Sequence, residues 1–341
     1  MHFDHGAEGR LLLREGDVVL AEYVYEPDEP QVESPRPYAL LRTLNGRDVT
    51  AYRPDDHVWH KGLSLALPNV GPHNFWGGPT YVAGEGYVQL PNNGRQAHRS
   101  FVASDTPIAD AAAGLARIDE DLDWITEPGE TLLTERRTLT ARRVGGDAWA
   151  LTWRSALTNV SRDAAAFGSP TTKGRDDAGY AGIFWRGPSG FAGGAILRAD
   201  GAAGDAARGE PAPWLAFVAP DESAGVVMLD AGPGAGEHPW FARSAGYAGL
   251  CPAPFFFDEA VLEPDATLVL AAAVIVDGPD VAALAPSVGA NLVAELGAVP
   301  EDRISAEPGA VPEDRLSAEL SAVPEARLSA ERGAVPEGSP E

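Results

Sequence analysis

Histidines gather in one short stretch of the chain, where they could carry out proton transfer. His57 and His60 are three residues apart, His73 follows, and Asp55 and Asp56 come directly before the first of them. Histidine is the natural general acid or base near neutral pH. The stretch therefore predicts an acid/base site with His57, His60 and His73 as catalytic residues.

The same histidines could instead bind a transition metal, because imidazole suits Zn, Cu, Fe and Ni, with Asp55 or Asp56 as an outer partner. Two arguments oppose this reading. An H-x-x-H pair is a weak metal signal without a helix, and on an extended strand His57 and His60 would point to opposite faces. The one cysteine, Cys251, lies in an apolar stretch, where we expect a buried, inert thiol. We expect no stoichiometric transition metal and no cofactor.

A second charged segment, residues 173–188, is bracketed by glycines and runs into an expected strand. Arg175 could hold a carboxylate through two hydrogen bonds, and Asp177 could act as a catalytic base or as a ligand. Alternatively, the Arg–Asp pair only stabilises a tight turn. Further along, His238 could complete an acid/base pair or could lie in a solvated loop.

Aromatic and amide side chains surround the first histidines. Trp and Tyr beside Asn and Asp make a surface on which sugar rings stack and hydroxyls are bonded, although the same aromatics could form a packed core. We therefore predict a carbohydrate pocket whose substrate-binding residues are Asp56, Asn74, Trp76, Arg175, Tyr180 and His238.

The elements that must position these side chains are strands. Short β-branched and aromatic runs alternate with turn signals over the body of the chain, at 18–25, 138–144, 148–155, 183–186, 214–218, 223–229 and 267–276. No alternation of strands with helices occurs, which argues against a doubly wound fold. This pattern predicts an all-β sandwich or closed barrel.

Composition limits the classes of function. The chain has 341 residues and a formal net charge of −24, which argues against nucleic acid and anionic membrane surfaces as partners. The longest apolar run, residues 266–276, is too short to span a bilayer. No signal peptide is recognisable at the start, and a single cysteine allows no intramolecular disulfide. We expect a cytoplasmic protein.

The chain divides into three parts by pattern. Residues 8–280 are expected to form one β-domain, and residues 281–296 a short helical or irregular segment broken by Pro286 and Gly289. Residues 297–341 repeat a 12-residue unit that is acidic and poor in large apolar residues. Too little apolar surface is available there to offset chain ordering, so we expect a disordered tail.

Several motifs, in order, resemble a bacterial family of unknown function labelled the PmoA family. They are Ser34–Tyr38, Arg53–Leu63, Asn74–Gly78, Gly174–Tyr180, Phe184–Pro188, His238–Phe241 and Pro254–Glu259. The resemblance implies a large β-sandwich similar to the galactose-mutarotase-like supersandwiches, which bind carbohydrate on a concave sheet face. One difference is that Tyr38 is followed by Ala39–Arg42, where the family pattern has a His-Pro pair.

Together, these features predict a carbohydrate-binding or carbohydrate-active protein that transfers a proton on a sugar, as an isomerase, epimerase or lyase would. One alternative is a non-catalytic sugar-binding or regulatory module with the same pocket. A second is the metal-dependent oxidoreductase that the family label suggests. The expected partner is a small carbohydrate, without nucleic acid or membrane, and the oligomeric state stays open.

Overall fold

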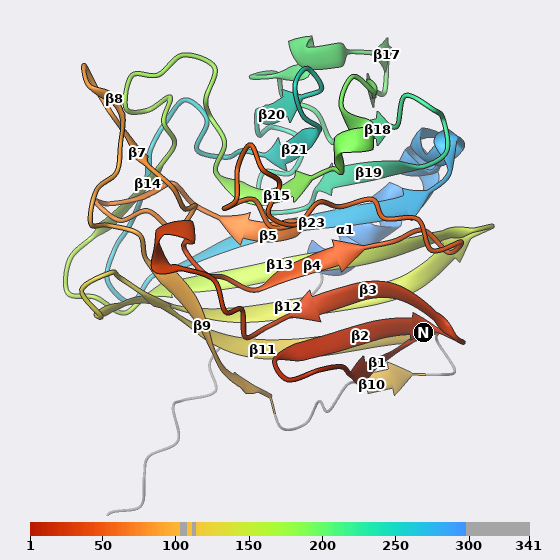
Figure 1. The fold of residues 1–341 in the computed structure, drawn as a ribbon, viewed down its shortest axis with the longest axis horizontal. Coiled ribbons are helices and arrows are strands. Elements are labelled where there is room, and N and C mark those ends of the chain that lie inside the picture. Colours follow the sequence, from red (N-terminus) through yellow and green to blue (C-terminus); the bar gives the residue numbers. More distant parts are fainter. Residues whose placement is uncertain (103–107, 111–113, 298–341) are drawn as a thin grey trace, which may run out of the picture. The chain divides into compact units, whose positions relative to one another are not determined.

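Two large antiparallel sheets form the body of the protein (Figure 1). The structure is a computed structural model and describes residues 1–102, 108–110 and 114–297. The repeat tail predicted to be disordered lies, from residue 298 onward, outside the described residues.

The first sheet has eight strands, and its order brings distant parts of the chain together. In spatial order they are β1 (His2–His5), β2 (Arg10–Glu15), β3 (Val18–Val24), β4 (Tyr38–Leu41), β5 (Leu63–Ala66), β15 (Gly182–Arg186), β21 (Gly249–Pro252) and β20 (Trp240–Arg243). The N-terminal strands therefore continue directly into strands from the second half of the chain.

The second sheet has ten strands, with β9 paired to β11 beside the main order. The strands are β10 (Ile108–Asp110), β11 (Leu115–Ile125), β12 (Thr131–Gly145), β13 (Ala148–Asn159), β23 (Thr267–Asp277), β19 (Gly225–Asp230), β18 (Trp214–Val218), β16 (Ala195–Arg198), β17 (Gly201–Ala202) and β9 (Arg95–Phe101). The hairpin of β12 and β13 turns at Gly145–Asp147, as the glycine signal predicts.

Smaller elements complete the chain. A three-stranded sheet holds β22 (Ala260–Leu262), β14 (Ala165–Gly168) and β6 (Asn69–Val70), and a separate hairpin holds β7 (Thr80–Val82) and β8 (Gly86–Val88). The helical turns are η1 (Gln31–Glu33), η2 (Ser189–Phe191), η3 (Gly204–Ala207), η4 (Pro279–Leu284), the π-turn η5 (Ala285–Gly289) and α1 (Ala290–Gly297). Within the described residues, no helix is long and apolar enough to cross a membrane.

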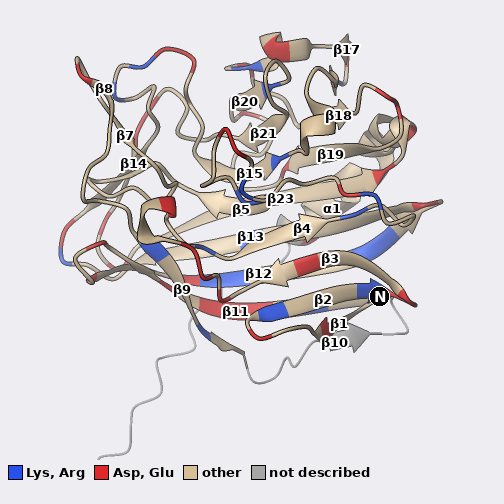
Figure 2. Ribbon diagram, viewed as in Figure 1, with Lys and Arg blue, Asp and Glu red and all other residues tan. Residues whose placement is uncertain are grey.

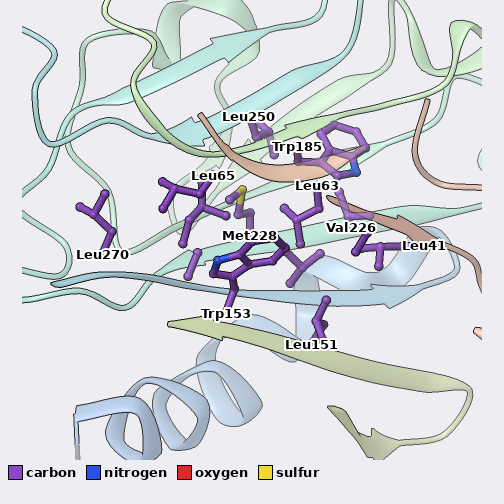
Figure 3. Close-up of a cluster of buried hydrophobic side chains, with 14 of the residues drawn as sticks. Leu41, Leu63, Leu65, Leu151, Trp153, Trp185, Val226, Met228, Leu250 and Leu270 are labelled. Carbon is purple, nitrogen blue, oxygen red and sulfur yellow. The ribbon is translucent and has the colours of Figure 1, made fainter. Parts of the chain in front are cut away.

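The main core lies between the two large sheets (Figure 3). Side chains from both sheets meet there, among them Leu63 and Trp185 from the first and Trp153 and Met228 from the second. Successive residues of a strand point to opposite faces, so every second side chain enters this core. The prediction of an all-β fold built as a large sandwich is confirmed.

The outer faces of the two sheets carry different layers. The outer face of the ten-stranded sheet packs against η4, η5 and α1, with Val281, Leu292 and Leu296 buried on it. The outer face of the eight-stranded sheet instead carries an aromatic cluster that includes Phe184, Phe241 and other side chains. In β15 and β20 the pleat sends Trp185 and Trp240 into the core and their neighbours Phe184 and Phe241 outward.

Candidate functional site

A cavity of about 420 Å³ opens over the aromatic cluster on the outer face of the eight-stranded sheet. Small-molecule sites typically measure roughly 300–1,000 Å³. Of the residues predicted to form the site, those that line this cavity are His57, His60, Trp76, Arg175, Asp177 and Tyr180. The fold thus brings together the two charged segments that the sequence analysis treated separately. We refer to this cavity as the pocket.

Closely packed aromatic rings form the floor of the pocket. The Trp76 ring lies 4.5 Å from Tyr180 and 5.0 Å from Phe184, measured between ring centroids. Tyr180 in turn lies 5.5 Å from Phe241. Burial raises the pKa of the Tyr180 hydroxyl, so it stays protonated and can donate a hydrogen bond. A floor of this kind offers flat apolar faces with polar edges.

The loop that carries Trp76 is shaped by two glycines and one asparagine. Asn74 Oδ1 accepts hydrogen bonds from the backbone N–H of Trp76 at 2.8 Å and of Gly77 at 3.0 Å. Gly78 has a φ of +68°, and a Cβ there would lie 2.8 Å from the Trp59 ring. Only glycine fits both the backbone angle and the close ring. Asn74 is therefore a buried support of the pocket wall and does not line the pocket.

His57 and His60 face each other because the segment between them is not extended. The His57 N–H donates to Pro54 O and the His60 N–H to His57 O, both at 2.9 Å, which makes two successive turns. The two imidazole rings stack with centroids 4.6 Å apart and planes 11° apart. The argument that the two histidines point to opposite faces assumed an extended strand. The segment forms turns instead, so that argument does not hold.

Arg186 of β15 joins the two histidines to a carboxylate. Its Nη2 donates to both Asp56 oxygens at 2.8 Å, and its Nη1 lies 2.8 Å from His60 Nδ1. Asp56 Oδ2 also lies 2.8 Å from His57 Nδ1. The result is one connected chain: His57, Asp56, Arg186, His60. The Arg186 side chain is buried, whereas that of Asp56 is 45% exposed.

These contacts fix different roles for the two rings. An arginine only donates, so His60 Nδ1 must accept, which leaves Nε2 of the neutral ring as an N–H donor. An ionised carboxylate only accepts, so His57 Nδ1 donates to Asp56 and Nε2 keeps its lone pair. Burial lowers the pKa of His60 well below its usual value, and nearby His57 and Arg186 add to this effect.

Asp56 stays ionised at neutral pH. Burial acts to raise the pKa of the Asp56 carboxyl, but hydrogen bonds from Arg186 and His57 outweigh it, and the net shift is downward. A carboxylate held in this form orients the His57 ring and supports a positive charge on it. The pair therefore has the arrangement of a general base with its orienting acid.

The rim of the pocket comes from the 173–188 segment and from the β7–β8 hairpin. Arg175 Nη1 donates to the Tyr87 hydroxyl, and its guanidinium lies 4.7 Å from the centre of that ring. The Tyr87 hydroxyl is also 2.7 Å from that of Tyr180. Asp177 is exposed and has a φ of +56°, a left-handed conformation that is uncommon for a residue other than glycine.

A fully buried arginine, Arg36, holds the pocket loops from behind. Its Nη1 donates to Trp76 O at 2.9 Å, its Nη2 to Trp59 O at 2.7 Å and its Nε to Ser64 Oγ at 3.2 Å. Burial lowers the pKa of Arg36 to about 10, so it is still charged at neutral pH. This residue explains why the Ser34–Tyr38 motif belongs with the Trp59 and Trp76 motifs.

Two predicted residues lie apart from the others. His73 is half-buried in an isolated bridge with Val70, and its Nδ1 is buried without a partner among the described residues. His238 pairs with Asp230, with Nδ1 and Oδ2 2.9 Å apart, beside a second cavity of about 20 Å³. Neither lines the pocket, so the structure does not bring them to His57 and His60.

The sequence analysis missed several residues that line or support the pocket. Tyr247, Arg208, Arg243 and Phe241 line it, and Arg186 and Arg36 support it. A weak signal was available for two of them, because Phe241 and Arg243 are two apart on one strand and therefore share a face. Nothing local could have shown that Arg186 meets His60, 126 positions earlier in the chain.

Among the residues that the structure describes, no three His, Cys, Asp or Glu side chains lie close enough together to hold a metal ion. His57 and His60 have neighbouring rings, but each uses its Nδ1 in a hydrogen bond. That the purified protein binds no stoichiometric transition metal stays a prediction.

Comparison with known proteins places the chain in a family. A family model matches residues 10–284 and is described as a family of unknown function, DUF6807. The chain belongs to this family. The PmoA label, which the sequence motifs suggested, finds no support in the comparisons. No curated protein matches the chain.

Two solved structures are distantly similar to the chain. One is a heparinase III, with 9% identity and a TM-score of 0.38, covering 82% of this chain and 35% of that one. The chain thus spans about a third of the length of that protein. Another is the Slr1438 protein from Synechocystis sp. PCC 6803, with 10% identity and a TM-score of 0.33, covering 81% and 95% of the two chains. Similarities at these TM-scores carry no conclusion about function.

Proposed function

We propose that the pocket binds a sugar and transfers a proton on it, with His57 as the general base. The observation that carries this proposal is the pair of stacked imidazoles with opposite tautomers at an aromatic pocket. One ring presents a lone pair and the other an N–H, and the ring centroids are 4.6 Å apart. In such a pair one ring can remove a proton while the other stabilises the negative charge that develops.

The steps follow from the contacts. His57 Nε2 takes a proton from the sugar, and the resulting positive charge on the ring faces the Asp56 carboxylate. Negative charge developing on a sugar oxygen meets the Nε2–H of His60, which Arg186 holds in place. Return of the proton to the same or another atom releases the sugar or its isomer. A base of this kind contributes roughly 10²–10⁴ in rate.

The aromatic floor supports a sugar as the ligand. Trp76, Tyr180 and Phe241 line the pocket with aromatic rings, and Tyr180 and Tyr87 add hydroxyl groups. The apolar face of a pyranose can stack on such rings while its hydroxyl groups bond to the polar edge. No bound group other than the sugar is needed for this chemistry.

Proton NMR in D₂O tests the proposal, because one set of spectra detects every type of proton transfer on a sugar. The full chain is incubated with a panel of hexoses, ketohexoses, hexuronates and keto-sugars, and anomer exchange, epimerisation, elimination and deuterium uptake are followed. We expect one sugar to react faster than without protein, and His57→Ala to abolish this while affinity changes only a few-fold. His5→Ala, on the exposed end of β1, is the matched control and should react like the wild type.

Two results would contradict the proposal in different ways. If sugars bind but none reacts, and His57→Ala only shifts the affinity, the protein is a binding module. If no sugar binds, the pocket has another ligand. Melting temperatures of the variants establish that a lost reaction is not a lost fold.

A further inference from the structure

Two arginines converge on one corner of the pocket next to Tyr247. Arg243 follows Phe241 by two residues on β20, so the pleat places both on the pocket face. Arg208 comes directly after η3, and its guanidinium carbon lies 5.5 Å from the centre of the Phe241 ring. The Arg243 guanidinium carbon lies 4.4 Å from the centre of the Tyr247 ring.

Each of the two guanidinium groups is held in place through its own Nε atom. Arg243 Nε donates to Ala245 O at 2.9 Å, and Arg208 Nε donates to Ala242 O at 3.0 Å. These two bonds restrain both guanidinium groups before a ligand arrives. A preorganised guanidinium loses less entropy on binding than a mobile one.

The positive charge of this corner is poorly balanced by the protein. Among the described residues, no carboxylate lies within 4.0 Å of Arg243, and the one nearest to Arg208, that of Asp205, is 3.8 Å away. The Asp205 carboxylate also accepts the backbone N–H of Ser244 at 2.6 Å, so its oxygens are shared between Arg208 and this N–H. This poorly balanced positive corner occurs in a chain whose formal net charge is −24.

The neighbouring charges do not change this balance. Arg186 is a third guanidinium beside Tyr247, at 4.0 Å, but its charge is matched by Asp56. Asp176 and Asp177 also line the pocket, yet both are exposed and therefore hydrated. Burial raises the pKa of Tyr247, while the charges of Arg243, Arg186 and Arg208 oppose that shift.

We propose that Arg208 and Arg243 bind the carboxylate of an acidic sugar, so that the pocket selects hexuronates over neutral hexoses. This inference rests on the proposed sugar-binding function and adds the class of substrate. A guanidinium fork matches a carboxylate with two parallel hydrogen bonds. Two arginines, one of them near Asp205, balance a single negative charge better than the charge of about −1.5 to −2 on a phosphate monoester.

Calorimetric titration of the full chain with matched sugars tests this assignment. The probes are galactose and galacturonate, glucose and glucuronate, and glucose 6-phosphate. We expect a hexuronate to bind at least about tenfold more tightly than its neutral partner, because charge-assisted hydrogen bonds are the stronger ones. Arg243→Gln and Arg208→Gln should each remove most of this preference by weakening hexuronate binding more than hexose binding.

Controls separate charge and fold from the specific contact. Arg198→Gln, on β16 and paired with Asp200 outside the pocket, should behave like the wild type. Arg243→Lys keeps the charge but loses the fork, so it should fall between wild type and Arg243→Gln. This variant also provides the test if Arg243→Gln does not fold, as judged by its melting temperature.

The outcomes distinguish this inference from the proposed function. Equal affinity for hexose and hexuronate, unchanged in both glutamine variants, overturns the carboxylate site and leaves the sugar pocket standing. Tighter binding of glucose 6-phosphate than of either hexuronate also overturns the carboxylate site. Binding of none of these sugars overturns the proposed function and this inference together.

Discussion

Two buried arginines, Arg137 and Arg186, stand at the centre of charged clusters that are built in different ways. Arg137 lies between the large sheets, where it bonds through all three of its side-chain nitrogens to Glu135, Gln96 and Tyr23. Arg186 bonds to Asp56 and His60, while its Nε is buried without a partner among the described residues. The first cluster is closed, and the second ends at the pocket.

The closed cluster shows what a structural network needs. Glu135 accepts from Arg137, from Trp124 Nε1 at 2.7 Å and from Ser155 Oγ at 2.5 Å, and its side chain is fully buried. On β11 and β12, acidic and basic segments lie side by side, with Glu120 in register with Arg137 (Figure 2). Every partner is supplied from inside the protein, as a buried network requires.

The pocket cluster leaves one side for a ligand. Each histidine uses Nδ1 inside the cluster, which leaves both Nε2 atoms for whatever enters the pocket. Asp56 remains 45% exposed, so water can still reach its carboxylate. Two clusters of similar composition thus differ in whether their hydrogen bonds close within the protein: the closed one suits stability, and the open one suits the proposed chemistry.

The largest effect on stability is expected from opening the closed cluster. Arg137→Met removes the partner of Glu135 and leaves a buried, unpaired carboxylate, which costs about 3–5 kcal/mol of unfolding free energy. Arg136→Met is the matched control one residue earlier. It breaks a partly exposed pair with Asp121 and should cost no more than about 1 kcal/mol. Urea denaturation measures both, and equal losses would contradict the distinction.

Removing the other arginine should affect function more than stability. Arg186→Gln loses the contacts to Asp56 and His60, but the freed Asp56 carboxylate can be hydrated, so we expect a loss of about 2 kcal/mol. Sugar turnover should fall at least about a hundredfold, because the His60 tautomer is no longer imposed. Urea denaturation and the NMR assay measure the two effects. If Arg186→Gln were as unstable as Arg137→Met, or if it kept full turnover, the description of the Arg186 cluster as open toward the pocket would be wrong.

Two histidines should shift the pH dependence of stability in opposite directions. The pKa of His60 is lowered by burial, so unfolding takes up a proton below about pH 6.5, and its contribution to stability falls as the pH falls. The pKa of His238 is raised by its hydrogen bond to Asp230, against the effect of burial. Its contribution is therefore complete below about pH 6.5 and is lost as the pH rises through the folded-state pKa.

Denaturation of His60→Gln and His238→Gln between pH 5 and pH 8 checks these signs. Relative to the wild type, His60→Gln should be least destabilising at pH 5, and His238→Gln should be most destabilising there. We expect the His238 effect to stay within about 1 kcal/mol, since it reflects one partly exposed hydrogen bond. If the destabilisation of both variants changed with pH in the same direction, His60 would not be kept neutral by burial.

The sequence predicts the fold well because strand signals are local. Alternating side chains at 148–155 and the glycines at 145–146 define a hairpin without reference to distant residues. Residue type also points to the neighbourhood of His57 and His60. It does not separate them from His73, because the difference lies in the turn at 54–60 and in distant partners such as Arg186 and Arg36. Those contacts depend on strand order, which no short motif specifies.

The tautomers of His57 and His60 test the central claim most directly, because they can be measured without a substrate. In ¹⁵N-labelled protein, long-range ¹H–¹⁵N spectra distinguish a protonated Nδ1 from a protonated Nε2, and His57→Gln and His60→Gln assign the signals. We predict that neutral His60 carries its proton on Nε2 and is still neutral where an ordinary histidine becomes charged, while neutral His57 carries its proton on Nδ1. The same tautomer on both rings, or a His60 that becomes charged near pH 6.5, would contradict the account.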